Sequence, residues 1–308
     1  MDFPTLLHSV SYSGSWAQPF LLLEQFIDKA AALGFDGVML MAKRPHLSLL
    51  DYGTNRRREL RARLEERRLT RVCVAAYNNF TADLEHGGIP QNEIQIHYLT
   101  ELARLTADLG GETLRIFTGF ENPAAGFTTQ WFQVVNSVKE CARRAAEFGV
   151  TIGVQNHHDI ASGFESQYEL IQAVAEPNCK AMFDAWAPAL QGADLKAAAQ
   201  RMAPITAHTT IANYQRLPRY QYQAGLTNYA ASQPWVQAVP VDEGFIDYHD
   251  FLLSLHSAGF RGSVAYEMCS PIRGGGAMEN LDCYARKFIA FITQLRAKAG
   301  GTGLLAGH

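Results

Sequence analysis

The sequence predicts a single-domain α/β protein in which short parallel strands alternate with helices. The chain has 308 residues, 47% of them hydrophobic and 19% charged, a globular composition that excludes a disordered or fibrous protein. Short apolar runs alternate with amphipathic segments along the chain, and no change of composition marks a linker. Parallel strands joined by helical crossovers are the expected outcome of this alternation.

The elements follow one another in eight strand–helix units. We expect strands at the short apolar runs 6–12, 36–42, 70–77, 112–119, 150–156, 179–185, 205–211 and 262–268. We expect helices at the amphipathic segments 20–35, 54–69, 91–111, 128–149, 164–175, 193–203, 246–259 and 277–300. A Gly after Leu33 is typical of a helix end, and Asp247 is a candidate N-cap.

Eight such units in this length favour a closed (β/α)₈ barrel, the TIM barrel, over an open doubly wound sheet. The first crossover also lacks the Gly-x-Gly-x-x-Gly of a dinucleotide-binding unit. We expect the barrel to span residues 1–300, with a long insertion at about 212–245 and a flexible tail at 301–308.

Charge and cysteine content restrict the class of partner. The net charge of −3 and the isoelectric point near 6.4 provide no basic field for nucleic acid or an anionic membrane. Five cysteines without a Cys-x-x-Cys pair indicate a reducing compartment and not a disulfide framework. Because we find no signal peptide and no apolar run of membrane-spanning length, we expect a cytoplasmic protein.

Polar residues stand at or near the ends of four consecutive predicted strands. Gln155, Asp184, His208 and Glu267 come from the fifth, sixth, seventh and eighth strands. Functional groups of such barrels lie at the carboxyl ends of the strands, so we expect these four to converge. One amide oxygen, one imidazole and two carboxylates suit a divalent cation, with Mn²⁺ or Mg²⁺ favoured and Co²⁺ an alternative.

These stretches carry a family resemblance that spans nearly the whole chain. The segments CARRAAEFGVTIGVQNHHD, MFDAW, TAHTT and GFIDYHDFLLSLHSAGFRGSVAYEM resemble the fifth to eighth units of the xylose isomerase-like sugar isomerase/epimerase superfamily. The resemblance implies one divalent metal, most simply Mn²⁺, held by Glu, Asp, His and Glu. Asp184, His208 and Glu267 match that pattern, whereas Gln155 stands where the family has its first Glu.

The substitution at Gln155 shapes the expected chemistry. An amide can still offer its oxygen to a metal, but it cannot accept a proton at neutral pH. His157, on the same strand face, is the expected replacement base, with Glu267 as the second catalytic group. Both would act on a proton next to a metal-polarised carbonyl of a sugar or keto-sugar.

Several outcomes of that proton transfer stay open. We favour β-elimination, as in the C-glycoside deglycosidase and 3-keto-glycoside lyase branch that the sequence resembles. The alternative is a sugar isomerase or epimerase of the D-tagatose 3-epimerase type. An alternative of another class is a non-catalytic sugar-binding or scaffolding subunit. A DNA-repair endonuclease of the same architecture is disfavoured by the net charge.

Other side chains are expected to contact the substrate. Arg115 could clamp hydroxyls or a carboxylate, or form an ion pair on the barrel floor. The further candidates are His46, Arg273, Trp186 and Tyr214. The aromatic residues of the insertion suit either stacking on a sugar or a subunit interface. The expected partners are a small carbohydrate or glycoside, and a homo-oligomer or a second subunit, without nucleic acid or membrane.

Overall fold

The computed structural model describes residues 1–84 and 87–301, and its eight parallel strands close into a barrel in the order β1-β10-β7-β6-β5-β4-β3-β2. These strands are β1 Thr5–His8, β2 Gly37–Met41, β3 Arg71–Ala75, β4 Thr113–Ile116, β5 Thr151–Gln155, β6 Cys179–Met182, β7 Thr206–Ile211 and β10 Ser263–Tyr266. The predicted (β/α)₈ barrel is therefore confirmed. Except for Gly301, the tail predicted at 301–308 lies outside the described residues.

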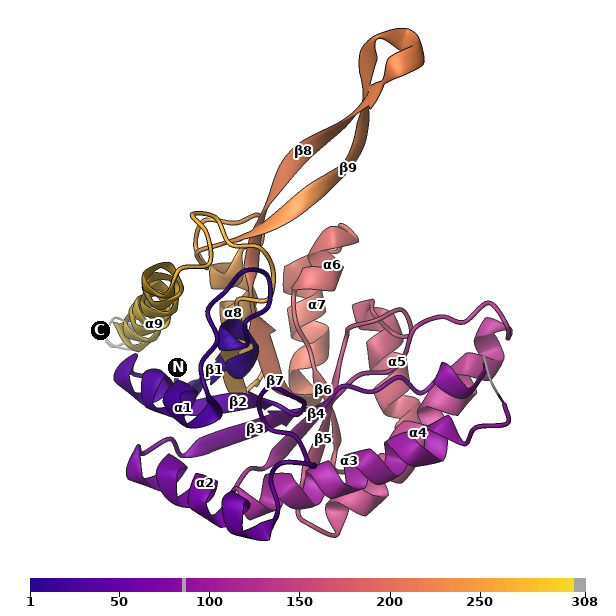
Figure 1. The fold of residues 1–308 in the computed structure, drawn as a ribbon, viewed down its shortest axis with the longest axis vertical. Helices are drawn as coiled ribbons and strands as arrows, with labels where there is room; N and C mark the ends of the chain where they lie inside the picture. Colours follow the sequence, from indigo (N-terminus) through magenta and orange to yellow (C-terminus); the bar gives the residue numbers. More distant parts are fainter. Residues whose placement is uncertain (85–86, 302–308) are drawn as a thin grey trace, which may run out of the picture.

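Helices surround the strands on the outside of the barrel (Figure 1). They are α1 Leu23–Ala32, α2 Thr54–Glu66, α3 Gln91–Asp108, α4 Phe127–Ala146, α5 Phe164–Val174, α6 Trp186–Leu190, α7 Leu195–Met202, α8 Tyr248–Ser257 and α9 Met278–Gly301, with short 3₁₀ turns η1 Ser9–Tyr12, η2 Ala82–Leu84, η3 Ala203–Ile205 and η4 Ala224–Leu226. The Asp247 side chain caps α8 by accepting from the Asp250 N–H at 3.0 Å. In residues 1–84 and 87–301, no helix has the length and apolar character needed to cross a membrane.

The interior of the barrel changes from apolar to polar toward the carboxyl ends of the strands. Six buried apolar side chains fill the centre: Leu6, Met39, Cys73, Ala75, Met182 and Ala265. Side chains alternate along a strand, so the next inward positions after Leu6, Met182 and Ala265 are His8, Asp184 and Glu267. Parallel strands place these polar positions at one end of the barrel, above the apolar layer.

The insertion predicted at about 212–245 forms a long antiparallel hairpin. Strands β8 Asn213–Gln223 and β9 Asn228–Val239 pair from Asn213 with Val239 to Gln223 with Asn228. The hairpin projects far from the barrel (Figure 1). Its register shifts between Leu217 and Arg219, at Pro218, which has no N–H to donate to a ladder. Polar and aromatic residues dominate this segment, so it lacked the apolar runs by which the barrel strands were predicted.

Candidate active site

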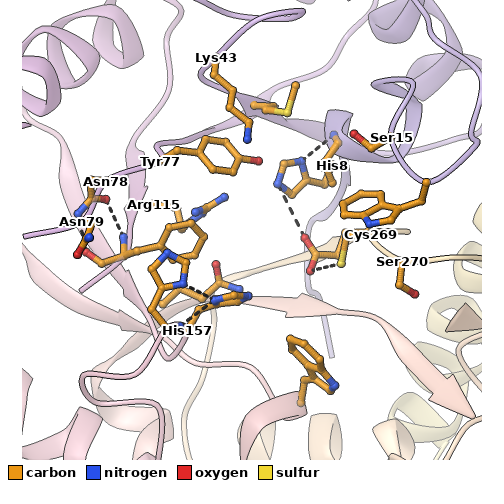
Figure 2. Close-up of a pocket in the computed structure, with 18 of the residues that line it drawn as sticks. His8, Ser15, Lys43, Tyr77, Asn78, Asn79, Arg115, His157, Cys269 and Ser270 are labelled. Carbon is orange, nitrogen blue, oxygen red and sulfur yellow. Dashed lines mark hydrogen bonds and ion pairs between the residues drawn. The ribbon is translucent and has the colours of Figure 1, made fainter. Parts of the chain in front are cut away.

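A pocket of about 890 Å³ opens at the carboxyl ends of the barrel strands. Its wall includes His8, Arg115 and Gln155 from three different strands, and Glu267 directly after β10. Figure 2 shows Lys43, Tyr77 and Arg115 together on one side of this pocket, across from His8 and Cys269. Convergence from strands distant in sequence makes this pocket the candidate active site.

Gln155 and Asp184 lie side by side at their strand ends and are joined by a hydrogen bond from the amide to the carboxylate. The Gln155 amide nitrogen Nε2 donates to Asp184 Oδ2 at 2.8 Å, and the Trp186 N–H donates to Oδ1 at 3.1 Å. Asn156 Oδ1 accepts from the Asp184 N–H at 2.8 Å and thereby holds this turn in place. Burial raises the pKa of the Asp184 carboxyl to about 6.

Glu267 has the carboxyl group that faces the pocket. Burial first, and the neighbouring Asp184 charge in addition, raise its pKa to about 7 despite a hydrogen bond from Cys269. The Cys269 thiol donates to Glu267 Oε1 at 3.2 Å, and His8 Nε2 lies 3.8 Å from Oε2. His8 Nδ1 accepts the Val10 N–H, so its proton lies on Nε2 and faces the carboxyl. A carboxyl that titrates near neutral pH can both take up and release a proton.

The structure does not bring His208 to the other three predicted metal ligands. On β7, His208 pairs with Met182 on β6 and with Ser263, the first residue of β10, which lies four residues before Glu267 in the sequence. Its side chain lines a small cavity with Leu6, Thr113 and Ser263, toward the amino ends of the strands. The sequence placed His208 on the correct strand but at the wrong height.

The residues that remain do not fit a resident divalent cation. Across 1–84 and 87–301, no three His, Cys, Asp or Glu side chains are grouped so as to hold a metal ion. Both Asp184 oxygens already accept hydrogen bonds, and Gln155 turns its NH₂ group toward one of them. The inward position of β7 nearer the pocket is Thr210, whose buried hydroxyl has no hydrogen-bond partner in the described part of the chain and is a weaker metal ligand than imidazole. These residues therefore do not form the predicted Mn²⁺ site.

His157 lines the pocket, but in a form that donates a hydrogen bond. Its Nδ1 accepts the His158 N–H at 2.8 Å, and His158 Nδ1 also lies 2.8 Å away. Burial, reinforced by the charge of Arg115, lowers the pKa of His157 to about 4. The ring is therefore neutral with its proton on Nε2, which corrects the expected role of His157 as a base.

His158 forms the side wall beside His157. Its ring stacks between Phe117 and Phe120, at centroid distances of 4.2 and 4.0 Å, and its backbone φ is +67°. A positive φ is uncommon for a residue with a side chain, so the surrounding contacts hold it there. This conformation directs the His158 N–H at His157 Nδ1.

Three of the five predicted substrate contacts line the pocket: Arg115, Trp186 and Tyr214. The other two do not. His46 is 2% exposed, stacks near Phe20 and forms a hydrogen bond between its Nε2 and the Leu21 carbonyl. Arg273, in the loop after the last barrel strand, pairs with Glu243 at the surface and does not line the pocket.

Residues that the sequence reasoning missed include His8, Lys43, Tyr77 and Cys269. His8 stands at the end of the first strand, as Glu267 stands at the end of the last. Treating all eight strand ends alike, and not only the fifth to eighth, would have found it.

Comparisons with known proteins agree with this architecture. The sequence profile of the family described as "Xylose isomerase-like TIM barrel" matches residues 27–288. No curated protein matches the chain.

Solved structures share the fold at low sequence identity. An L-ribulose 3-epimerase is similar at a TM-score of 0.74 and 18% identity, with 100% of both chains covered. A D-psicose 3-epimerase from Clostridium cellulolyticum H10 is similar at a TM-score of 0.72 and 17% identity, and the match covers 95% of this chain and 99% of that one. The "probable 3-DHS dehydratase AsbF" from Bacillus anthracis is similar at a TM-score of 0.69 and 19% identity, and the match covers 95% of this chain and 99% of that one. These likenesses establish the fold alone, and the family match over residues 27–288 shows that the chain belongs to the xylose isomerase-like TIM barrel family.

Proposed function

We propose that this protein is an isomerase or epimerase that moves a proton next to the carbonyl of a small sugar-like molecule. The observation that carries the proposal is Glu267, a carboxyl with a pKa of about 7 in the wall of the pocket. The sugar epimerases among the structural neighbours support the substrate class. The proposed reaction does not depend on the predicted Mn²⁺, because the side chains present do not suit that ion.

Glu267 and His157 have complementary parts in this reaction. The Glu267 carboxylate removes a proton from the hydroxyl-bearing carbon next to the carbonyl and returns it to the carbonyl carbon, while the hydroxyl proton passes to the former carbonyl oxygen; this gives an isomer. The neutral His157 ring donates its Nε2–H to the carbonyl oxygen, where negative charge develops. The Cys269 thiol and the His8 ring, at 3.2 and 3.8 Å from the two Glu267 oxygens, orient the carboxyl group.

The aromatic wall gives the substrate a surface to pack against. Trp186 lies between Tyr214 and His157, at ring-centroid distances of 5.3 and 5.9 Å. Rings of this kind cover the apolar face of a sugar and exclude water from the reacting carbon.

A second candidate is β-elimination, the outcome that the sequence favoured. Its support is that Glu267 is the carboxyl group that lines the pocket in the described parts of the chain, whereas Asp184 is bound to Gln155. A two-base epimerisation needs an acid–base group on each face of the carbon, whereas isomerisation and elimination need one.

Incubation with sugars, keto-sugars and 3-oxo-glycosides in D₂O tests the proposal. We expect deuterium at the carbon next to the carbonyl together with an isomeric product; loss of water or of an aglycone would instead identify elimination. Glu267→Gln should lower exchange by about 10²–10⁴-fold, the usual contribution of a general base. Glu243→Gln, a surface carboxylate, is the matched control. Exchange that survives Glu267→Gln would refute the assignment.

We also infer the setting of this activity from the sequence. The cysteine usage and net charge favour a cytoplasmic protein that acts on a small carbohydrate without nucleic acid or membrane partners. Homo-oligomer formation or a second subunit stays a prediction, which sedimentation of the purified chain tests.

A further inference from the structure

The pocket contains two cations that the proposed reaction does not use. Lys43, Arg44 and Arg115 line the pocket, and Glu267 is the carboxylate among its lining residues. Arg44 is engaged at the rim by Asp51, through two hydrogen bonds of 2.8 Å. Lys43 and Arg115 have no carboxylate partner within 4.0 Å in residues 1–84 and 87–301.

Arg115 is the more deeply buried of these two cations. It is 2% exposed, and its Nη1 donates to the Ala76 carbonyl at 2.8 Å. Its Nε is buried and has no hydrogen-bond partner among the described residues. The guanidinium lies 3.9 Å from the centroid of the Phe117 ring. A buried charge without a counter-ion is costly, so its retention in a pocket wall indicates that an anion completes it.

Lys43 adds a second positive charge to the same wall. Its Nζ lies 3.8 Å from the centroid of the Tyr77 ring, and the Arg115 guanidinium lies 5.0 Å from that centroid (Figure 2). Burial, followed by the charge of Arg115, lowers the pKa of Lys43, so the two cations act on each other. An anion between them would relieve this repulsion.

We propose that the pocket binds an anionic sugar, whose charged oxygen group lies against Arg115 and Lys43. The neutral end of the molecule then points across the pocket toward Glu267. This inference rests on the proposed function and names its substrate class. The anionic group can be the carboxylate of a sugar acid or the phosphate of a sugar phosphate, because both accept charge-assisted hydrogen bonds from a guanidinium.

Calorimetric titration with three unreactive six-carbon probes tests the inference. Sorbitol is neutral, gluconate has a carboxylate, and sorbitol 6-phosphate has a phosphate. At low salt, at least one anion should bind about tenfold or more tightly than sorbitol, with an advantage that shrinks as salt rises. The tighter of the two anions identifies the charged group. Equal affinity for all three probes, or no binding of either anion, overturns the inference.

Variants attribute this preference to the two cations. Arg115→Gln should weaken anion binding by about tenfold to hundredfold, the size of a lost charge-assisted hydrogen bond, and leave sorbitol unaffected. Arg144→Gln, a surface cation outside the pocket that is already bound to Glu140, is the matched control and should bind as the wild type does. If Arg115→Gln does not fold, Lys43→Gln makes the same comparison at an exposed side chain. An unchanged anion preference in the folded variant overturns the inference.

Binding and turnover fail separately in these tests. Charge-dependent binding of an anion without deuterium exchange would leave this inference standing and remove the proposed function. Exchange on neutral sugars without any preference for an anion would leave the proposed function standing and overturn this inference.

Discussion

Replacing Glu267 with glutamine should make the protein more stable at neutral pH. The wild-type carboxyl has a pKa raised from 4.5 to about 7 in the folded state, chiefly by burial. Between these values the folded protein binds more protons than the unfolded chain, so stability falls as pH rises through this window. Each unit of the shift corresponds to about 1.4 kcal/mol. Glutamine does not titrate, so the variant does not lose this part of the free energy of unfolding as pH rises.

The magnitude follows from the two pKa values. Relative to the wild type, Glu267→Gln should gain less than about 1 kcal/mol at pH 5 and about 3 kcal/mol at pH 7 to 8. Urea unfolding at pH 5, 6, 7 and 8 measures this difference. Glu243→Gln is the control, because Lys287 and Arg273 lower the pKa of Glu243 and its stabilising effect has the opposite pH dependence. A difference that does not change with pH, or one that shrinks as pH rises, would contradict the electrostatic argument for Glu267.

The remaining predictions concern pH, metal and the hairpin. Exchange activity should rise through pH 7 as Glu267 ionises and show no step from His157 above pH 5, because its pKa is about 4; a pH–rate profile that requires a protonated imidazole at pH 6 would contradict this. EDTA should leave the exchange rate unchanged; loss of activity in EDTA that is recovered by adding Mn²⁺ would instead support the predicted metal site. Replacing Pro218–Pro234 with Asn-Gly, between the cross-strand partners Leu217 and Trp235, should preserve the circular dichroism spectrum and sugar binding; loss of the folded barrel would show that the hairpin supports it.

The composition of the insertion could not predict where its aromatic residues lie relative to the pocket. Its distal tyrosines, Tyr220, Tyr222 and Tyr229, are 53–65% exposed and lie on the part that projects from the barrel. At its base, Tyr214 and Val236 line the pocket. Aromatic content in the sequence could not separate these two groups, because their positions depend on where the ribbon leaves the barrel.

The positions of single side chains in the candidate site could also be predicted only in part from the sequence. Period-two alternation predicted that Gln155 and Asp184 point inward at their strand ends, because the inward direction follows from the pleat, and the two side chains meet there. It misplaced His208, because the height of a residue in a closed barrel depends on the stagger between neighbouring strands. Only the pairing of His208 with Ser263 reveals that it lies four residues below Glu267.

The sequence by itself determined the barrel, its strand order and which end contains the polar groups. These features follow from local periodicity and from the rule that parallel strands with helical crossovers share one direction. The tertiary structure decided the chemistry. The tautomer of His157 depends on the backbone of His158, and the pKa of Glu267 on its burial beside Asp184. The unpaired state of Arg115 depends on which carboxylates the fold keeps away from it, since charge and hydrogen bonding act through space between residues distant in the chain.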